Sequence, residues 1–171
     1  MSKRTSLREF QQYLTKRLAD QALGGSSSSL LSFQTRQMRW VVPLSEVGEI
    51  LPLPALTSVP LTLPSFAGLA NIRGNLHAVT DFAAFLGEGA TPLASQSVRL
   101  ILAGAKSGGN AALLVARILG LKNLDDFTPG GRSPDAPAWN TGSFLDSEGE
   151  TWHCLDFDLL LSNSQFMNIA A

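Results

Sequence analysis

The sequence has few of the residues from which disulfides and metal sites are built. It contains one cysteine and two histidines, so an internal disulfide is impossible and an ordinary structural zinc site lacks ligands. No apolar run approaches the ~20 residues of a membrane-spanning helix. The first residues are polar and lead into an amphipathic stretch, unlike the apolar core of a signal peptide. These absences predict a cytoplasmic protein with no metal, no cofactor and no direct membrane insertion.

An excess of charge of either sign is also missing. Thirteen Lys and Arg residues stand against fourteen Asp and Glu residues, which gives a formal net charge of −1. Such a chain has no large positive field to hold a phosphate backbone, so general nucleic-acid binding is not expected. Hydrophobic residues make up 44% of the 171 residues. This length and composition predict one ordinary domain or two small packed lobes.

The residues that could act in catalysis are not expected to lie close enough together to form a catalytic pair. His77 and Asp81 share one face of a predicted strand but lie roughly 13 Å apart, at about 3.3 Å per residue. His153 and Cys154 are strand neighbours and point to opposite faces, so they cannot form a thiolate–imidazole pair. Cys154 is expected in the core, and the tryptophans at positions 139 and 152 are expected in the core or at the interface between the lobes. We therefore predict no catalytic residue and no enzyme, with an uncharacterised hydrolase as a remote alternative.

Residues 1–29 predict an amphipathic helix followed by a tether. Ser6-Leu7-Arg8-Glu9 has the spacing of a capping box, and apolar residues then recur every three or four positions as far as Leu23. Gly24-Gly25 ends this pattern, and the serines from 26 to 29 indicate a flexible tether. Three outcomes stay open: the helix packs on its own domain, docks in a partner's groove, or is a disordered tail.

The remaining chain, residues 30–171, predicts a mainly β domain with short helices. Apolar and polar residues alternate in pairs of segments separated by turn residues, which indicates hairpins. Gly74-Asn75 is a strong hairpin turn signal, and Asp81 is a good N-cap for a short helix over 82–86. A run of prolines between 52 and 64 favours extended chain. The predicted strands of the first half cover residues 31–35, 38–42, 46–51, 68–73 and 76–80.

The second half repeats this order. Gly74 precedes Asp81 by seven positions, and Gly149 precedes Asp156 by the same seven. We interpret the repeat as a degenerate duplication that gives two packed, five-stranded, barrel-like lobes at about residues 30–90 and 95–165. A coincidence of common turn residues is the alternative. The predicted strands of the second half cover residues 98–103, 111–116, 144–145 and 151–155, with an irregular stretch at 128–137 and a helix from Asp156 to Leu161.

Three segments resemble the signature of the CheW family of chemotaxis coupling proteins: Val47-Gly48-Glu49-Ile50, residues 68–75 (Gly-Leu-Ala-Asn-Ile-Arg-Gly-Asn) and Val79-Thr80-Asp81-Phe82. The resemblance extends over about residues 30–161, and its later part matches in pattern more than in letters. It implies two five-stranded barrels of the CheW-like, SH3-like kind, which agrees with the duplication.

The resemblance also implies a function. Members of the family are non-catalytic adaptors that couple the cytoplasmic tips of methyl-accepting chemoreceptors to the regulatory domain of a CheA-type histidine kinase. The N-terminal helix is similar to that of the type IV pilus branch, which implies control of twitching motility.

Carried over by position, the resemblance implies a receptor-binding site. Arg73 also stands out on physical grounds, because a guanidinium at a hairpin tip is free to project towards a partner. The alternatives are that Arg73 pairs with a nearby carboxylate, that Gly68 and Gly74 only supply positive φ, and that Val47 belongs to the core. The implied site residues are Val47, Glu49, Gly68, Asn71, Arg73 and Gly74.

A different class of function remains as the rival hypothesis. A barrel of this size could be a module that binds single-stranded nucleic acid. That function requires a basic face with exposed aromatic residues, and the sequence shows neither clustered Lys and Arg nor an aromatic ladder.

Overall fold

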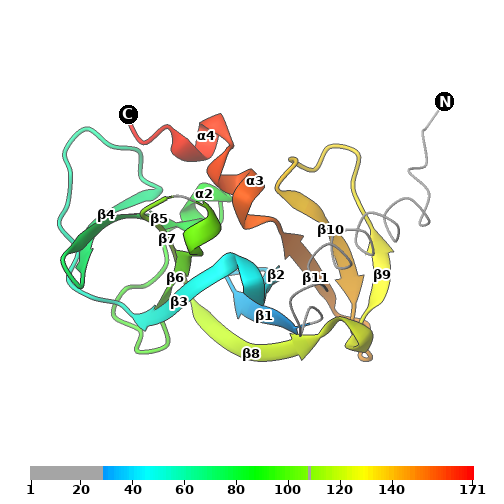
Figure 1. Ribbon diagram of the computed structural model, residues 1–171. Coiled ribbons are helices and arrows are strands. Elements are labelled where there is room, and N and C mark those ends of the chain that lie inside the picture. The colour runs from blue at the N-terminus through cyan, green and yellow to red at the C-terminus, as the bar shows by residue number, and fades with distance from the viewer. Residues whose placement is uncertain (1–28, 108) are drawn as a thin grey trace.

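The computed structural model describes residues 29–107 and 109–171. The helix and tether predicted before Ser29 lie outside this range. The described chain forms two β-sheets with short helices between them (Figure 1). The mainly β fold predicted from the sequence is therefore confirmed. The α-helices are α2 (Phe82–Phe85), α3 (Phe157–Leu161) and α4 (Ser164–Met167), and the 3-10 helices are η1 (Leu44–Glu46), η2 (Ala105–Ser107) and η3 (Leu124–Asp126).

One sheet has six strands and the other has five. The six-stranded sheet has the order β8-β1-β2-β11-β10-β9, and the five-stranded sheet has the order β3-β6-β7-β5-β4. Strand β9 lies in the stretch predicted to be irregular, and β8 was not among the predicted strands, so the described residues contain eleven strands where nine segments were predicted. The strands are β1 (Ser29–Gln34), β2 (Arg39–Pro43), β3 (Val47–Pro52), β4 (Phe66–Ile72), β5 (Asn75–Asp81), β6 (Arg99–Ala103), β7 (Ala111–Val115), β8 (Arg117–Asn123), β9 (Thr128–Gly131), β10 (Asn140–Leu145) and β11 (Thr151–Leu155).

The two sheets do not divide the chain where the duplication predicted. Strands β1 and β2 belong to the same sheet as β8 to β11, whereas the five-stranded sheet takes all of its strands from residues 47–115. The boundary expected between 90 and 95 is therefore wrong as a boundary between sheets. Two parallel pairings, β2 with β11 and β5 with β7, join segments that are distant in sequence. Local turn signals carry no information about such pairings.

The repeat itself is visible in two hairpin–helix units. Hairpin β4–β5 leads into α2, and hairpin β10–β11 leads into α3. Each hairpin has a register shift beside a glycine of positive φ, Gly68 (+132°) in the first and Gly142 (+155°) in the second. The side chains of Asp81 and Asp156 then accept a backbone hydrogen bond from the first turn of their helices. The predicted N-caps are confirmed.

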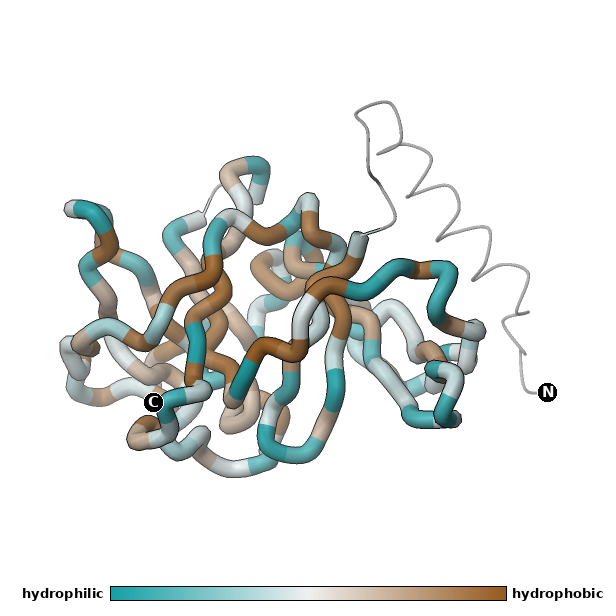
Figure 2. Tube along the Cα trace, turned by 90° about the horizontal axis from the view of Figure 1, so that it is seen from below, coloured by the Kyte–Doolittle hydropathy of each residue, from teal (hydrophilic) through white to brown (hydrophobic). Residues whose placement is uncertain are grey.

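Both sheets contribute to one central core. Trp40 of β2 packs edge-on against Phe82 of α2, with ring centroids 5.1 Å apart, and Trp139 lies 5.9 Å from Phe82. Figure 2 shows the hydrophobic segments gathered in the middle of the molecule and the polar ones at its turns. Each sheet also has a smaller hydrophobic core of its own. Because the largest core is shared, the lobes form one packed unit.

The residues predicted to be buried on sequence grounds are in these cores. Trp139, Trp152 and Cys154 are 6%, 4% and 4% exposed.

Polar groups also connect the lobes. The carboxylate of Glu46, which is 5% exposed, accepts a 2.7 Å hydrogen bond from the backbone N–H of Phe157 at the start of α3. None of the described helices has the length and apolar character needed to cross a membrane.

Candidate functional site

Four of the six predicted receptor-binding residues lie on the two edge strands of the five-stranded sheet, and Arg73 and Gly74 lie in the turn that follows one of them. Val47 and Glu49 belong to β3, and Gly68 and Asn71 belong to β4. These strands are at opposite ends of the strand order, so only a curled sheet can bring them together. An isolated bridge between Thr57 and Leu69 joins the chain that follows β3 to β4 and closes the curl.

The turn between β4 and β5 centres on Arg73-Gly74, one residue earlier than the Gly74-Asn75 pair predicted from the sequence. The residues on either side, Ile72 and Asn75, are paired in register. Arg73 and Gly74 have φ values of +53° and +85°, the pattern of a type I′ turn. The side-chain oxygen of Asn71 accepts a 3.0 Å hydrogen bond from the Gly74 N–H and so braces the turn.

An arginine is an unusual residue for this turn. Type I′ turns favour Asn-Gly, because positive φ brings a Cβ atom close to the following carbonyl oxygen at a cost of about 1–2 kcal/mol. The conformation places the Arg73 side chain outside the sheet, where it is 75% exposed. The turn therefore accepts strain and presents a guanidinium to solvent.

Arg73 forms a bidentate ion pair with Glu49 of β3. Nη1 donates to Oε2 over 2.8 Å, and Nη2 donates to Oε1 over 2.6 Å. This is the carboxylate pairing that the sequence left open as an alternative role for Arg73. The pair lies at the surface, with Glu49 32% exposed, and exposed pairs contribute only about 0–1 kcal/mol. Arg73 therefore remains accessible to a partner while it is paired.

Gly68 is buried and has a steric role. A Cβ atom at this position would lie 2.6 Å from the carbonyl oxygen of Thr57. Thr57 and Leu69 exchange two backbone hydrogen bonds of 2.8 Å here, so the glycine permits the close approach that closes the sheet. The sequence did not single out Thr57, although the prolines around it correctly indicated extended chain.

Of the six predicted residues, four reach the surface and two support it. Asn71, Arg73 and Gly74 are exposed, and Glu49 is half-buried. Val47 is half-buried as well, and it packs against the central core. The exposed part of the site is thus a charged hairpin tip with an adjacent carboxylate.

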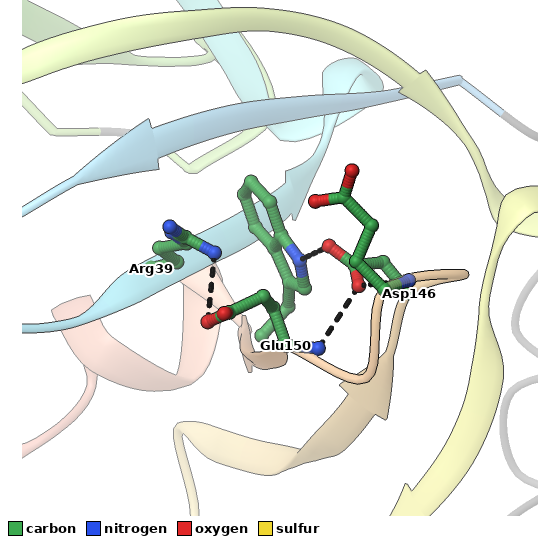
Figure 3. Close-up of polar contacts among 5 residues, drawn as sticks. Arg39, Asp146 and Glu150 are labelled. Carbon is green, nitrogen blue, oxygen red and sulfur yellow. Dashed lines mark hydrogen bonds and ion pairs between the residues drawn. The ribbon is translucent and has the colours of Figure 1, made fainter.

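The tip of the other hairpin, β10–β11, uses its polar groups internally (Figure 3). The Asp146 carboxylate accepts 2.9 Å hydrogen bonds from the indole N–H of Trp152 and from the backbone N–H groups of Glu148 and Glu150. The indole hydrogen bond is the main cause that holds the pKa of Asp146 below its usual value. Arg39 forms a 3.0 Å ion pair with Glu150, and its guanidinium lies 5.6 Å from the centre of the Trp152 ring.

The side chains best suited to acid–base chemistry have structural surroundings. The ring of His153 packs 5.1 Å from Trp40, and burial lowers its pKa, against a smaller opposing effect of Glu88. Cys154 is buried in the core of the six-stranded sheet. Within the described ranges, no three His, Cys, Asp or Glu residues converge on one point as metal ligands do.

Comparisons with known proteins agree with this architecture. The model of the CheW-like domain matches residues 29–165. Protein PilI of Pseudomonas aeruginosa is 33% identical over 104 residues, which cover 60% of this chain and 57% of PilI, so the match spans little more than half of that protein. The crystal structure of the scaffolding protein TtCheW from Thermoanaerobacter tengcongensis has the same fold, with a TM-score of 0.64 at 16% identity, over 83% of this chain and 98% of that one. The resemblance seen in the sequence motifs is confirmed: the chain belongs to the CheW-like family.

Proposed function

We propose that this protein is a non-catalytic adaptor that couples methyl-accepting chemoreceptors to a CheA-type histidine kinase in the control of type IV pilus twitching motility. Membership of the CheW-like family and the similarity to PilI support the proposal. The observation that carries it is the strained turn that presents Arg73 at the closed edge of the five-stranded sheet.

The ion pair with Glu49 prepares Arg73 for a partner. Glu49 holds the guanidinium through two of its five N–H groups, so donors remain for a carboxylate or carbonyl of the receptor. A receptor carboxylate could also replace Glu49 at little cost, because an exposed pair contributes only about 0–1 kcal/mol. The site therefore favours an acidic or carbonyl-lined receptor surface.

The shared core suits an adaptor that acts by position. Trp40, Phe82 and Trp139 join the two lobes in one cluster, so surfaces on different lobes keep a constant separation. A receptor bound at Arg73 and a kinase regulatory domain bound on another surface would then meet at a high effective concentration. No chemical step by the adaptor is required.

The test is the charge reversal Arg73→Glu in the full chain, titrated separately against a receptor cytoplasmic-tip fragment and the kinase regulatory domain. Receptor affinity should fall at least about thirtyfold, because like charges then meet at the interface. Kinase affinity and the melting temperature should change little, since the side chain is 75% exposed. Lys106→Glu is the matched control, because Lys106 is an exposed cation between two strands of the same five-stranded sheet. Normal receptor affinity for Arg73→Glu, or equal loss for both partners, would contradict the proposal.

A further inference from the structure

A cleft of about 340 Å³ lies where the chain passes from one sheet to the other. One wall is the end of β1 with the turn that follows it, and another is the loop over residues 91–98 that leads to β6. Ala116 and Arg117 form the rest, at the step from β7 of the five-stranded sheet to β8 of the six-stranded sheet. None of the six predicted receptor-binding residues lines this cleft.

Arg36 is held in place at the mouth of the cleft. Its Nη1 donates a 3.0 Å hydrogen bond to the backbone carbonyl of Glu88. It rests on the bare backbone of Gly89, where a Cβ atom would lie only 2.5 Å from Nη1. The Glu88 carboxylate braces the turn itself, since it accepts 2.9 Å hydrogen bonds from the Thr35 hydroxyl and the Gln37 N–H. These contacts orient the Arg36 guanidinium before any ligand binds.

Arg117 is oriented in a similar way from the other side. Its Nε donates a 2.9 Å hydrogen bond to the side-chain oxygen of Gln34. Neither of its terminal nitrogens has a hydrogen-bond or ion-pair partner among the described residues. The Ser97 hydroxyl, which donates a 2.9 Å hydrogen bond to the Ala116 carbonyl, adds a further polar group to the lining.

The charge in the cleft is unbalanced. Two arginines line it and no Asp or Glu does, whereas Arg39 and Arg73 each pair with a glutamate. Glu88 is not part of this lining; it touches Arg36 through its backbone carbonyl, and its carboxylate, which keeps its negative charge, accepts hydrogen bonds from Thr35 and Gln37. The open guanidinium N–H groups match the paired oxygens of a carboxylate, which arginine binds in bidentate geometry.

We propose that this cleft binds carboxylate side chains of an acidic segment of a partner protein, with Arg36 and Arg117 as the two binding cations. A cleft of this volume accommodates one or two side chains and not a folded domain. Nucleic acid is a poorer fit, because the chain has a net charge of −1 and the cleft has no aromatic lining on which bases could stack. The proposal does not depend on the receptor site at Arg73.

The test uses the full chain and a fluorescein-labelled hexaglutamate peptide with blocked ends, followed by fluorescence anisotropy at low salt. Arg36→Gln and Arg117→Gln should each weaken binding about tenfold, because each removes a charged donor. Arg132→Gln is the matched control: Arg132, like Arg36, donates to backbone carbonyls, but it lies outside the cleft. Hexaglutamine should not bind, and rising salt should weaken the complex.

Amide chemical shifts of the isotope-labelled full chain locate the peptide. Perturbations should gather at Gln34, Ser95 to Val98 and Arg117. Shifts elsewhere, an equal loss for Arg132→Gln, or absence of saturable binding would overturn the proposal. Displacement of the peptide by oligothymidine with the same arginine dependence would also overturn it, in favour of a nucleic-acid site. If Arg36→Gln failed to fold, Arg117→Gln and the shift map would still decide between these outcomes.

Discussion

The hairpin β4–β5 with α2 and the hairpin β10–β11 with α3 have the same backbone plan and opposite uses of charge at their tips. Both contain a glycine of positive φ beside a register shift, a further glycine in the turn and an aspartate N-cap. In the first unit the tip presents Arg73 to solvent, and Glu49 of another strand steadies it. In the second unit the Asp146 carboxylate accepts hydrogen bonds from within its own hairpin.

The difference shows how a duplicated scaffold separates stability from binding. Asp146 gains a buried indole N–H as its partner, so its charge helps to hold the hairpin. Arg73 occupies a strained backbone position for a surface pair that contributes little. One tip is arranged for stability, and the other leaves its strongest hydrogen-bonding group available.

The largest effect is expected for Gly68→Ala. The new Cβ would meet the Thr57 carbonyl at 2.6 Å with φ at +132°, so the free energy of unfolding should fall by about 3 kcal/mol. Gly74→Ala and Gly149→Ala are matched controls, because nothing lies within 4 Å of their added Cβ atoms; each should cost about 1 kcal/mol. Thermal melting ranks the three variants. If all three variants lost equal stability, Gly68 would be needed only for its positive φ and not for the close approach of Thr57.

A somewhat smaller effect is expected for Asp81→Ala. The buried carboxylate accepts 2.7 Å hydrogen bonds from the N–H and the hydroxyl of Thr91, besides capping α2. Its loss should lower the free energy of unfolding by about 2–3 kcal/mol. Thr91→Val removes a single donor and should cost about 1 kcal/mol. Denaturant unfolding measures both, and a change smaller for Asp81→Ala than for Thr91→Val would contradict the assignment of Asp81 as the centre of this network.

The Asp146 hairpin should make stability depend on pH. The folded-state pKa of Asp146 lies below its usual value of 3.8, chiefly because of the Trp152 indole. A carboxyl whose pKa is lowered by folding stabilises the protein above its unfolded pKa and loses that contribution as the pH falls through the folded one. The difference in melting temperature between the wild type and Asp146→Asn should therefore shrink below about pH 4. A difference that stays constant from neutral to acidic pH would exclude this role.

The smallest effect on stability is expected for Arg73→Asn, which gives the tip the Asn-Gly pair that type I′ turns favour. Relief of strain and loss of the ion pair nearly cancel, so the free energy of unfolding should stay equal or rise by about 0.5 kcal/mol. Binding to a receptor fragment should nevertheless weaken. A variant that melts much earlier than the wild type would show that the pair with Glu49 holds the sheet closed.

Local features of the fold were predictable because they depend on neighbours in the chain. The alternation in residues 31–42 predicted the β1–β2 hairpin, and its register pairs Leu31 with Val42 and Phe33 with Trp40. The aspartates at 81 and 156 predicted their helices because an N-cap acts within three residues. Arg73 was placed at a hairpin tip for the same kind of reason.

The sequence by itself determined the hairpins, the N-caps of α2 and α3, the repeated spacing and the burial of Trp139 and Trp152. Tertiary structure decided which sheet each strand joined, because the parallel pairings of β2 with β11 and β5 with β7 depend on edges that meet only after the chain has crossed between lobes. It also decided the partner of Arg73 and the burial of Gly68. Both follow from the curling of the five-stranded sheet, which brings Glu49 and Thr57 against a strand that local sequence does not connect to them.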